Sequence, residues 1–166
     1  QKYGCTFDHF YIKPACVNLD LFSLDKVGNH KLKEELGLTD KTTLLYAGKF
    51  GGIYLEKEIF DFVKIAYDYF GKNFRFLILT SHKREEILEF CKKSGVPQEI
   101  VISTFVKHAE IPYYMGLADF AITPVKPVPS KRYCTPIKDG EYWALGLPVI
   151  ITKDISDDSE IIEQEN

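Results

Sequence analysis

The chain has 166 residues, of which 45% are hydrophobic and 27% are charged. This composition is ordinary for one folded domain and excludes disorder as the main state. The chain has 21 Lys and Arg residues against 24 Asp and Glu residues, and the resulting net charge of −3 argues against a dedicated nucleic-acid-binding protein. No apolar run reaches the roughly 18 residues of a membrane-spanning helix.

The two ends of the chain predict a piece of a longer protein. The sequence begins at Gln1 without the pattern of a signal peptide, and residues 157–166 read as a helix with neither a cap nor a following strand. We therefore expect residues 1–166 to form a single domain of a larger protein, truncated at both ends.

The cysteines give no pattern of a metal site or a disulfide framework. No C-x-x-C pair occurs, and no histidine stands at zinc-ligand spacing beside them. We expect reduced thiols in a cytoplasmic protein. Cys134 has an alternative role as a reactive thiol, because Lys131 and Arg132 would favour its thiolate. The four residues are Cys5, Cys16, Cys91 and Cys134.

Short apolar runs alternate with helical periodicity along the first half of the chain. The most regular segment is the helix expected at 55–70, where Ile59, Phe60, Val63, Ala66 and Phe70 recur every three or four residues. The predicted elements, in order, are a strand at 10–17, a helix at 29–36, a strand at 42–47, the helix at 55–70 and a strand at 74–79.

The second half of the chain continues the alternation. It predicts a helix at 84–93, a strand at 99–105, a helix at 111–117, a strand at 118–123, a proline-rich loop at 124–134, a helix at 136–145 and a strand at 148–151. Strands that alternate with helices favour right-handed βαβ units, with helices on both faces of a parallel sheet. We therefore predict an α/β fold with a doubly wound, Rossmann-like parallel sheet.

Ligands of such a sheet bind outside the carboxyl ends of its strands. One candidate there is the loop Gly48-Lys49-Phe50-Gly51-Gly52. Its glycines let backbone N–H groups approach an anion, the following helix N-terminus adds a partial positive charge, and Lys49 adds a full one. We predict a phosphate site; a plain tight turn with positive φ is the alternative explanation.

A second candidate begins the helix expected at 136–145. Thr135 is placed to cap that helix ahead of Pro136, and Lys138 lies on its first turn, which together indicate a second anion site. Glu141 follows three residues later on about the same face and could accept two ribose hydroxyls. The alternative is a surface pair of Lys138 and Glu141.

Two anion sites and a carboxylate in one crevice indicate a nucleoside diphosphate as ligand. Phe105 and Val106, with His108, stand where a strand ends and could form a pocket for a base. His82 could donate to a phosphate or to a sugar hydroxyl, and its alternative is a solvated loop residue.

Residues 135–150, Thr-Pro-Ile-Lys-Asp-Gly-Glu-Tyr-Trp-Ala-Leu-Gly-Leu-Pro-Val-Ile, resemble the stretch S-P-x-K-x-x-E-Y-x-A-x-G-x-P-V-I of group 1 glycosyltransferases, which have the GT-B fold. Residues 46–52 resemble the strand and glycine loop that open the donor domain of that family. Residues 101–106 and 118–124 resemble its base-side strand and its A-D-x-x-x-x-P segment, and residues 10–22 loosely resemble its linker strand. The resemblance implies the C-terminal, nucleotide-sugar-binding half of a GT-B enzyme.

The resemblance also implies a function. The domain would bind a UDP- or GDP-sugar for retaining, metal-independent hexosyl transfer in polysaccharide biosynthesis, to an acceptor held by an N-terminal domain in cis. No cofactor, metal or nucleic acid is expected, no catalytic residue is assigned within this domain, and alone it would be inactive. The location would be cytoplasmic, with peripheral association at the inner face of a membrane as an option for the full-length protein.

The family pattern assigns roles to particular residues. Glu141 would bind the ribose, and the loop at Phe105 and Val106 would hold the base. The diphosphate would be held by side chains and backbone N–H groups of the two anion sites, namely Gly48, Lys49, Gly51, Gly52, Thr135 and Lys138.

The sequence departs from the family pattern at three positions. Tyr133 stands eight residues before Glu141, where the family often has a Glu for the donor sugar, so His82 and Tyr133 become the candidate sugar contacts. Lys49 replaces the usual Arg, and Tyr54 replaces a Lys, so Lys131 or Arg132 could complete the diphosphate clamp.

Two other functions fit parts of the pattern. One is a GT-B domain of the epimerase type, which acts on a nucleotide sugar without an acceptor. The other is a non-enzymatic α/β interaction module, in which exposed Tyr113, Tyr114 and Tyr133 would contact a partner.

Overall fold

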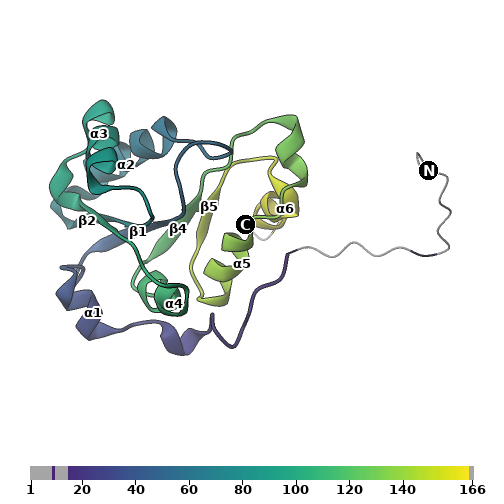
Figure 1. The fold of residues 1–166 in the computed structure, drawn as a ribbon, viewed down its shortest axis with the longest axis horizontal. Helices are drawn as coiled ribbons and strands as arrows, with labels where there is room; N and C mark the ends of the chain where they lie inside the picture. Colours follow the sequence, from purple (N-terminus) through teal and green to yellow (C-terminus); the bar gives the residue numbers. More distant parts are fainter. Residues whose placement is uncertain (1–8, 10–14, 165–166) are drawn as a thin grey trace.

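The computed structural model describes His9 and residues 15–164. One parallel sheet has the strand order β3-β2-β1-β4-β5, so the chain starts in the middle, builds outward on one side and returns to the other side of β1 (Figure 1). The prediction of a doubly wound, Rossmann-like sheet is confirmed. The strands are β1 (Thr42–Ala47), β2 (Phe74–Leu79), β3 (Val101–Thr104), β4 (Phe120–Thr123) and β5 (Val149–Ile151).

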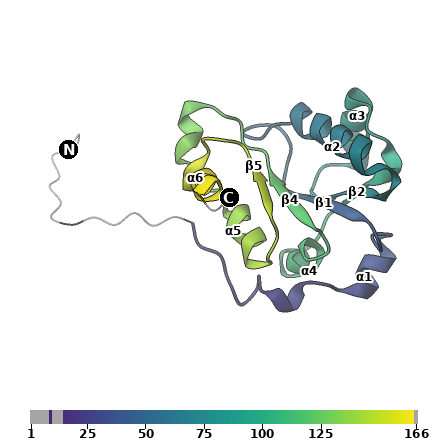
Figure 2. The ribbon, with the colours of Figure 1, turned by 180° about the vertical axis from the view of Figure 1, so that it is seen from behind.

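Helices cover both faces of this sheet. Figure 2 shows α2 and α3 together on one side and α1, α4 and α5 on the other. The helices are α1 (His30–Glu35), α2 (Lys57–Phe70), α3 (Arg84–Ser94), α4 (Ile111–Met115), α5 (Ile137–Ala144) and α6 (Ser156–Gln164). In the part of the chain that the structure describes, none of them combines the length and apolarity needed to span a bilayer.

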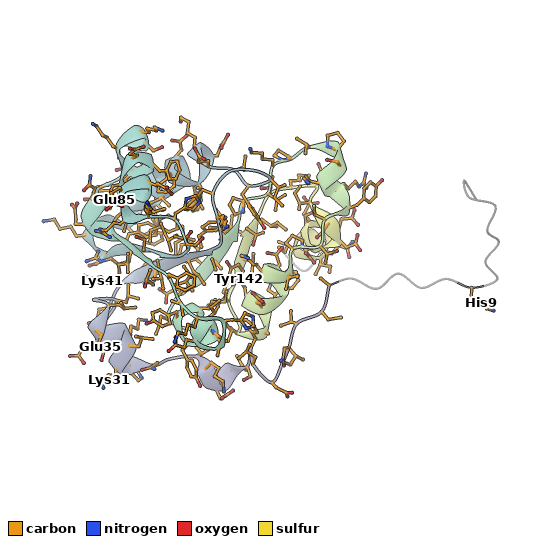
Figure 3. The ribbon with its side chains drawn as sticks, in the orientation of Figure 1. His9, Lys31, Glu35, Lys41, Glu85 and Tyr142 are labelled. Atoms are coloured by element: carbon orange, nitrogen blue, oxygen red, sulfur yellow. The ribbon has the colours of Figure 1, made fainter. Side chains whose placement is uncertain are left out.

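The central strand β1 shows why the apolar runs form strands. Leu44 and Tyr46 belong to the core under α2 and α3, whereas Leu45 and Ala47 belong to the core on the opposite face. Side chains alternate between the faces of a strand, so a strand covered on both faces is apolar along most of its length. The buried Tyr142 of α5 reaches the end of this strand, where its hydroxyl accepts a hydrogen bond from Ala47 N–H at 3.1 Å (Figure 3).

The predicted bounds are confirmed for β1 and β2 and shift by one or two residues at the other strands and helices of the sheet. The helix expected at 55–70 begins at Lys57, because Leu55 N–H donates to Pro124 O at 2.7 Å and so holds that residue beside the segment after β4. The strand expected at 99–105 shortens to β3, since residues 98–100 form a 3₁₀ turn. The loop expected at 124–134 contains a 3₁₀ turn, Pro129–Tyr133.

Two further expectations concern the N-terminal segment and the start of α5. Of the strand expected at 10–17, residues 10–14 lie outside the described residues and residues 15–17 carry no strand. The prediction that Thr135 caps the helix was wrong. Pro136 is the N-cap residue and Ile137 the first helical residue, because Pro136 keeps an extended backbone with ψ of 104°.

Candidate functional site

A cleft of about 300 Å³ opens at the carboxyl edge of the sheet. Its walls come from the loops after β1, β2 and β3, from α4, and from α5, which follows β4. It therefore lies across the place where the strand order reverses, the usual ligand site of such sheets. We call this cavity the donor cleft, after the nucleotide-sugar donor that the family resemblance leads us to expect here. It is lined by Ala47, Gly48, Lys49, Leu79, Thr80, Ser81, Phe105, Val106, His108, Ile111, Met115, Lys138 and Glu141.

The loop after β1 packs directly against α5. At Gly48, where φ is +156°, an added Cβ would lie 3.1 Å from Tyr46 Oη and 3.2 Å from Lys138 Cε, so a side chain there would be tightly packed and would need one of these groups to shift. The Tyr46 hydroxyl also donates to Lys49 O. The absence of a side chain at Gly48 thus brings the glycine loop and Lys138 together, and Lys49 and Lys138 line the same cleft.

The second half of the glycine loop lies outside the donor cleft. Gly51 and Gly52 have φ of +80° and +62°, and within the described chain neither backbone N–H donates a hydrogen bond. The helix that follows contributes no residue to the cleft walls. Its N-cap is Glu56, whose Oε2 lies 3.3 Å from where a Gly51 Cβ would stand. A carboxylate therefore already lies beside this part of the loop.

The first turn of α5 supplies the charged wall of the donor cleft. Lys138 is the second residue of the helix and Glu141 lies one turn later, and both line the cleft. Partial burial raises the pKa of Glu141, while the charges of Lys138 and His108 act in the opposite direction. The wall that α5 gives to this cleft therefore carries both a carboxylate and an ammonium group.

The opposite wall follows β3. Phe105 is 73% exposed and Val106 is buried, and both line the cleft. His108 lies on the next turn, with its ring edge-on to Phe22 at 6.2 Å between centroids. An exposed aromatic ring over an apolar floor can hold a flat heterocycle.

His82 lies behind the glycine loop and is not among the cleft residues. Its Nε2 accepts a hydrogen bond from Phe50 N–H at 3.1 Å, and its Nδ1 lies 2.6 Å from Glu86 Oε2. Both ring nitrogens are engaged within the protein, so His82 supports the loop and is not placed as a sugar contact. The neighbouring Thr80 and Ser81 do line the cleft; only their place after a strand signalled this in the sequence.

A second cavity of about 240 Å³ adjoins the donor cleft, and Lys138 lines both. Thr135 lies in this second cavity and not in the donor cleft, while Tyr133 is 86% exposed and lines neither. The cavity is lined by Ile53, Tyr54, Thr123, Val125, Cys134, Thr135, Pro136, Ile137 and Lys138. Among the described residues, no group of three or more His, Cys, Asp or Glu side chains is arranged to hold a metal ion.

No family model and no curated protein matches the chain, but solved structures do. WaaG, a glycosyltransferase involved in lipopolysaccharide biosynthesis, aligns with a TM-score of 0.65 at 15% identity, over 92% of this chain and 40% of that one. Anabaena Alr3699/HepE, solved in complex with UDP-glucose, aligns with a TM-score of 0.61 at 14% identity, over 87% and 38%.

A third solved structure is itself a single domain. The C-terminal domain of the group 1 family glycosyl transferase LpcC from Francisella tularensis aligns with a TM-score of 0.54 at 14% identity, over 84% of this chain and 71% of that one. These alignments show that the chain has the fold of the C-terminal half of a GT-B protein, as the sequence motifs indicated. The chain spans about 40% of the length of WaaG and of HepE.

Proposed function

We propose that this chain is the donor-binding domain of a glycosyltransferase and that its donor cleft holds the nucleoside diphosphate of a UDP- or GDP-sugar. The observation that carries the proposal is the meeting of Lys49 and Lys138, from two separate elements, on one cleft that also contains Glu141. HepE, which shares the fold, is described in complex with UDP-glucose, and this supports the same ligand class here.

The two lysines would hold the diphosphate. Lys49 is presented by the loop after β1, and Lys138 by the N-terminus of α5, where no side chain caps the helix. Backbone N–H groups at a helix N-terminus favour an anion, and ammonium groups add charge-assisted hydrogen bonds. In sugar transfer the diphosphate leaves with increasing negative charge, so cations fixed beside it stabilise the transition state.

Glu141 and Phe105 would hold the nucleoside. A carboxylate can accept hydrogen bonds from two vicinal hydroxyls, and Glu141 lies on the cleft one turn after Lys138. Phe105 stands across the cleft with its ring exposed, ready to stack on a base, and Val106 forms the floor below it. In this arrangement the phosphates, the ribose and the base would lie along one cleft.

The remaining parts of the proposal concern the whole protein. An N-terminal domain in cis would bind the acceptor, transfer would be retaining and independent of metal, and the sugar would be a hexose destined for a polysaccharide. This domain alone would bind the nucleotide without transferring sugar. The protein would act in the cytoplasm, at the inner face of a membrane when its acceptor is there.

Titration calorimetry tests the binding proposal. We expect UDP or GDP to bind and ADP to bind more weakly, with the affinity lost in the Lys138→Ala, Glu141→Ala double variant. Absence of binding by both UDP and GDP would favour an interaction module instead. Donor consumption by the full-length protein, with and without acceptor, separates a transferase from an epimerase.

A further inference from the structure

The segment ahead of β1 runs past α5 and α4 before it reaches α1 (Figure 1 and Figure 2). We call residues 17–28 of this segment the strap. At three points a glycine of these two helices, or of the turns that end them, lies directly against the strap. The contacts pair Val17 with Gly140, Leu24 with Gly146 and Val27 with Gly116.

The closest of these contacts lies inside α5. A Cβ built on Gly140 would stand 2.6 Å from Val17 Cγ2, well inside the normal contact distance of two carbon atoms, so a side chain there must displace Val17. Glycine weakens the interior of a helix relative to alanine, and Gly140 is within α5. Helix propensity therefore does not explain this glycine, whereas the packing of Val17 does.

Gly140 lies on the side of α5 that faces away from Lys138. Successive residues of an α-helix are turned by about 100°, so Gly140, two residues later, stands about opposite Lys138, which lines the donor cleft. Glu141 follows directly and lines the same cleft. A short helix has little stability of its own, so its packing decides where it lies. The strap therefore supports the charged wall of the cleft from behind.

A second residue of the strap reaches the opposite wall of the cleft. Phe22 is buried, and its ring lies edge-on to that of His108, which lines the donor cleft. A turn fixes Phe22 within the strap, because its N–H donates to Asn18 O at 2.9 Å and Asn18 Oδ1 accepts from Asp20 N–H at 3.0 Å. The strap thus contacts α5 on one side of the cleft and His108 on the other.

We propose that the strap holds the two walls of the donor cleft in the arrangement that binds a nucleoside diphosphate, with Val17 as a positioning residue that acts through Gly140. This inference rests on the proposed function, because it takes the donor cleft as the nucleotide site. Coupling between two binding events is reciprocal. A nucleotide that binds better when the strap is in place must therefore also hold the strap in place.

Exchanging side-chain volume between Gly140 and Val17 tests the contact. Gly140→Ala should weaken the binding of UDP or GDP about tenfold in calorimetry, the effect of losing one hydrogen bond to a charged group. The Val17→Ala, Gly140→Ala double variant returns the space that the new methyl group needs, and should bind within about twofold of the wild type. A loss of affinity that the double variant does not recover would overturn the role of Val17.

The preference for ribose separates positioning from a loss of stability. We define it as the ratio of the affinities for UDP or GDP and for the 2′-deoxy counterpart. Partial unfolding lowers both affinities by the same factor, whereas a displaced α5 should reduce the preference, because Glu141 moves with it. Gly95→Ala is the matched control, since its φ of +66° strains any side chain and Gly95 ends α3 on the other face of the sheet. At a temperature where it is folded, this variant should keep the affinity and the preference.

Hydrogen exchange tests the coupling in the reverse direction. Saturating UDP or GDP should slow exchange at the Phe22 amide several-fold more than at the Val96 amide. Val96 N–H donates to Cys91 O at 2.9 Å at the end of α3, so its exchange reports the overall stabilisation by the ligand. Equal slowing at the two amides would overturn the coupling.

The outcomes also separate this inference from the proposed function. If neither UDP nor GDP binds the wild type, the proposed function falls and this inference with it. If one of them binds, but Gly140→Ala keeps the wild-type affinity and preference, only the positioning role is overturned. If Gly140→Ala does not fold, Val17→Ala takes its place: this variant must weaken binding, and the double variant must restore it.

Discussion

The imidazole of His82 accepts a hydrogen bond from the backbone N–H of Phe50, with 3.1 Å between the two nitrogens. Because Nε2 is the acceptor, the proton of the neutral ring lies on Nδ1, which donates to Glu86 on α3. The Phe50 ring is buried against Phe60 and Phe90. His82 therefore connects α3 to the glycine loop that presents Lys49.

Replacing His82 should loosen this loop. His82→Ala leaves the Phe50 N–H without its partner, which costs about 1–3 kcal/mol of stability where the group stays buried, and should weaken UDP or GDP binding. His82→Gln offers an oxygen near the position of Nε2 and should recover much of both. Hydrogen exchange at the Phe50 amide is the direct measurement. Unchanged exchange in His82→Ala would contradict the role.

The two cleft lysines should contribute separately to affinity. We expect Lys49→Ala and Lys138→Ala each to weaken diphosphate binding about tenfold, the loss of one charge-assisted interaction, and the effect to shrink at high salt. Lys31→Ala is the control, because the Lys31 side chain is 87% exposed on α1 (labelled in Figure 3) and does not line the cleft. Titration calorimetry at two salt concentrations measures both effects. If Lys31→Ala lost as much diphosphate affinity as Lys138→Ala, the effect would come from the net charge of the protein and not from a contact in the cleft.

Glu141 should distinguish ribose from deoxyribose. Glu141→Ala should lower the affinity for UDP or GDP by more than it lowers that for the 2′-deoxy nucleotide, because the deoxy form has only the 3′-hydroxyl to donate to the carboxylate. Burial raises the pKa of Glu141, so its carboxylate is protonated at a higher pH than an ordinary Glu. The preference for ribose should therefore decline as the pH falls, and the decline should begin at a higher pH than for a Glu with the ordinary pKa of 4.5. A preference that persists in Glu141→Ala would place the ribose elsewhere.

The strands and the gathering of cleft residues could be predicted because they follow from local pattern and topology. Strand bounds at 42–47 and 74–79 came from short, mostly apolar runs, and parallel strands bring every following loop to one edge. For that reason one cleft is lined by residues of both segments, namely Gly48, Lys49 and Lys138.

The role of His82 could not be predicted, because its partner Phe50 lies 32 residues away and is reached through backbone geometry. The second cavity could not be predicted either. It forms where residues 53–54 lie close to residues 123–138, and the hydrophobic periodicity of the sequence does not indicate such a contact. The prediction for Thr135 was wrong because the sequence Thr-Pro fits two arrangements equally well. Either Thr135 or Pro136 can be the N-cap residue, and in the structure it is Pro136.

Phe105 should bind the base and not the phosphates. Phe105→Ala should weaken UDP or GDP binding by about 1–3 kcal/mol, the usual worth of base stacking on an aromatic ring, whereas Phe105→Trp should preserve it. Inorganic pyrophosphate should bind wild type and Phe105→Ala equally, which separates base from phosphate contacts. Tyr69→Ala, at a ring that is 83% exposed on α2, is the control. A loss of pyrophosphate binding in Phe105→Ala would indicate a disturbed loop instead.

Asp139 is a buried carboxyl beneath the charged wall of the donor cleft. It has no exposed surface, its Oδ1 accepts from the Thr123 hydroxyl, and its Oδ2 has no partner among the described residues. Burial raises the pKa of Asp139 to about 7, and the nearby Asp158 of α6 adds to the rise. The folded protein therefore prefers the protonated form of this group more strongly than the unfolded chain does.

The stability of the domain should consequently fall as pH rises. The contribution of Asp139 is fully present below the unfolded pKa of 3.8 and is lost as pH rises through about 7. Asp139→Asn keeps an acceptor for Thr123 but carries no charge, so its melting temperature should fall less between about pH 5 and about pH 8 than that of the wild type. Asp40→Asn is the control, because Asp40 is exposed and its positive φ suits Asn. If Asp139→Asn shows the same pH dependence as wild type and Asp40→Asn, the buried carboxyl is not the group that titrates.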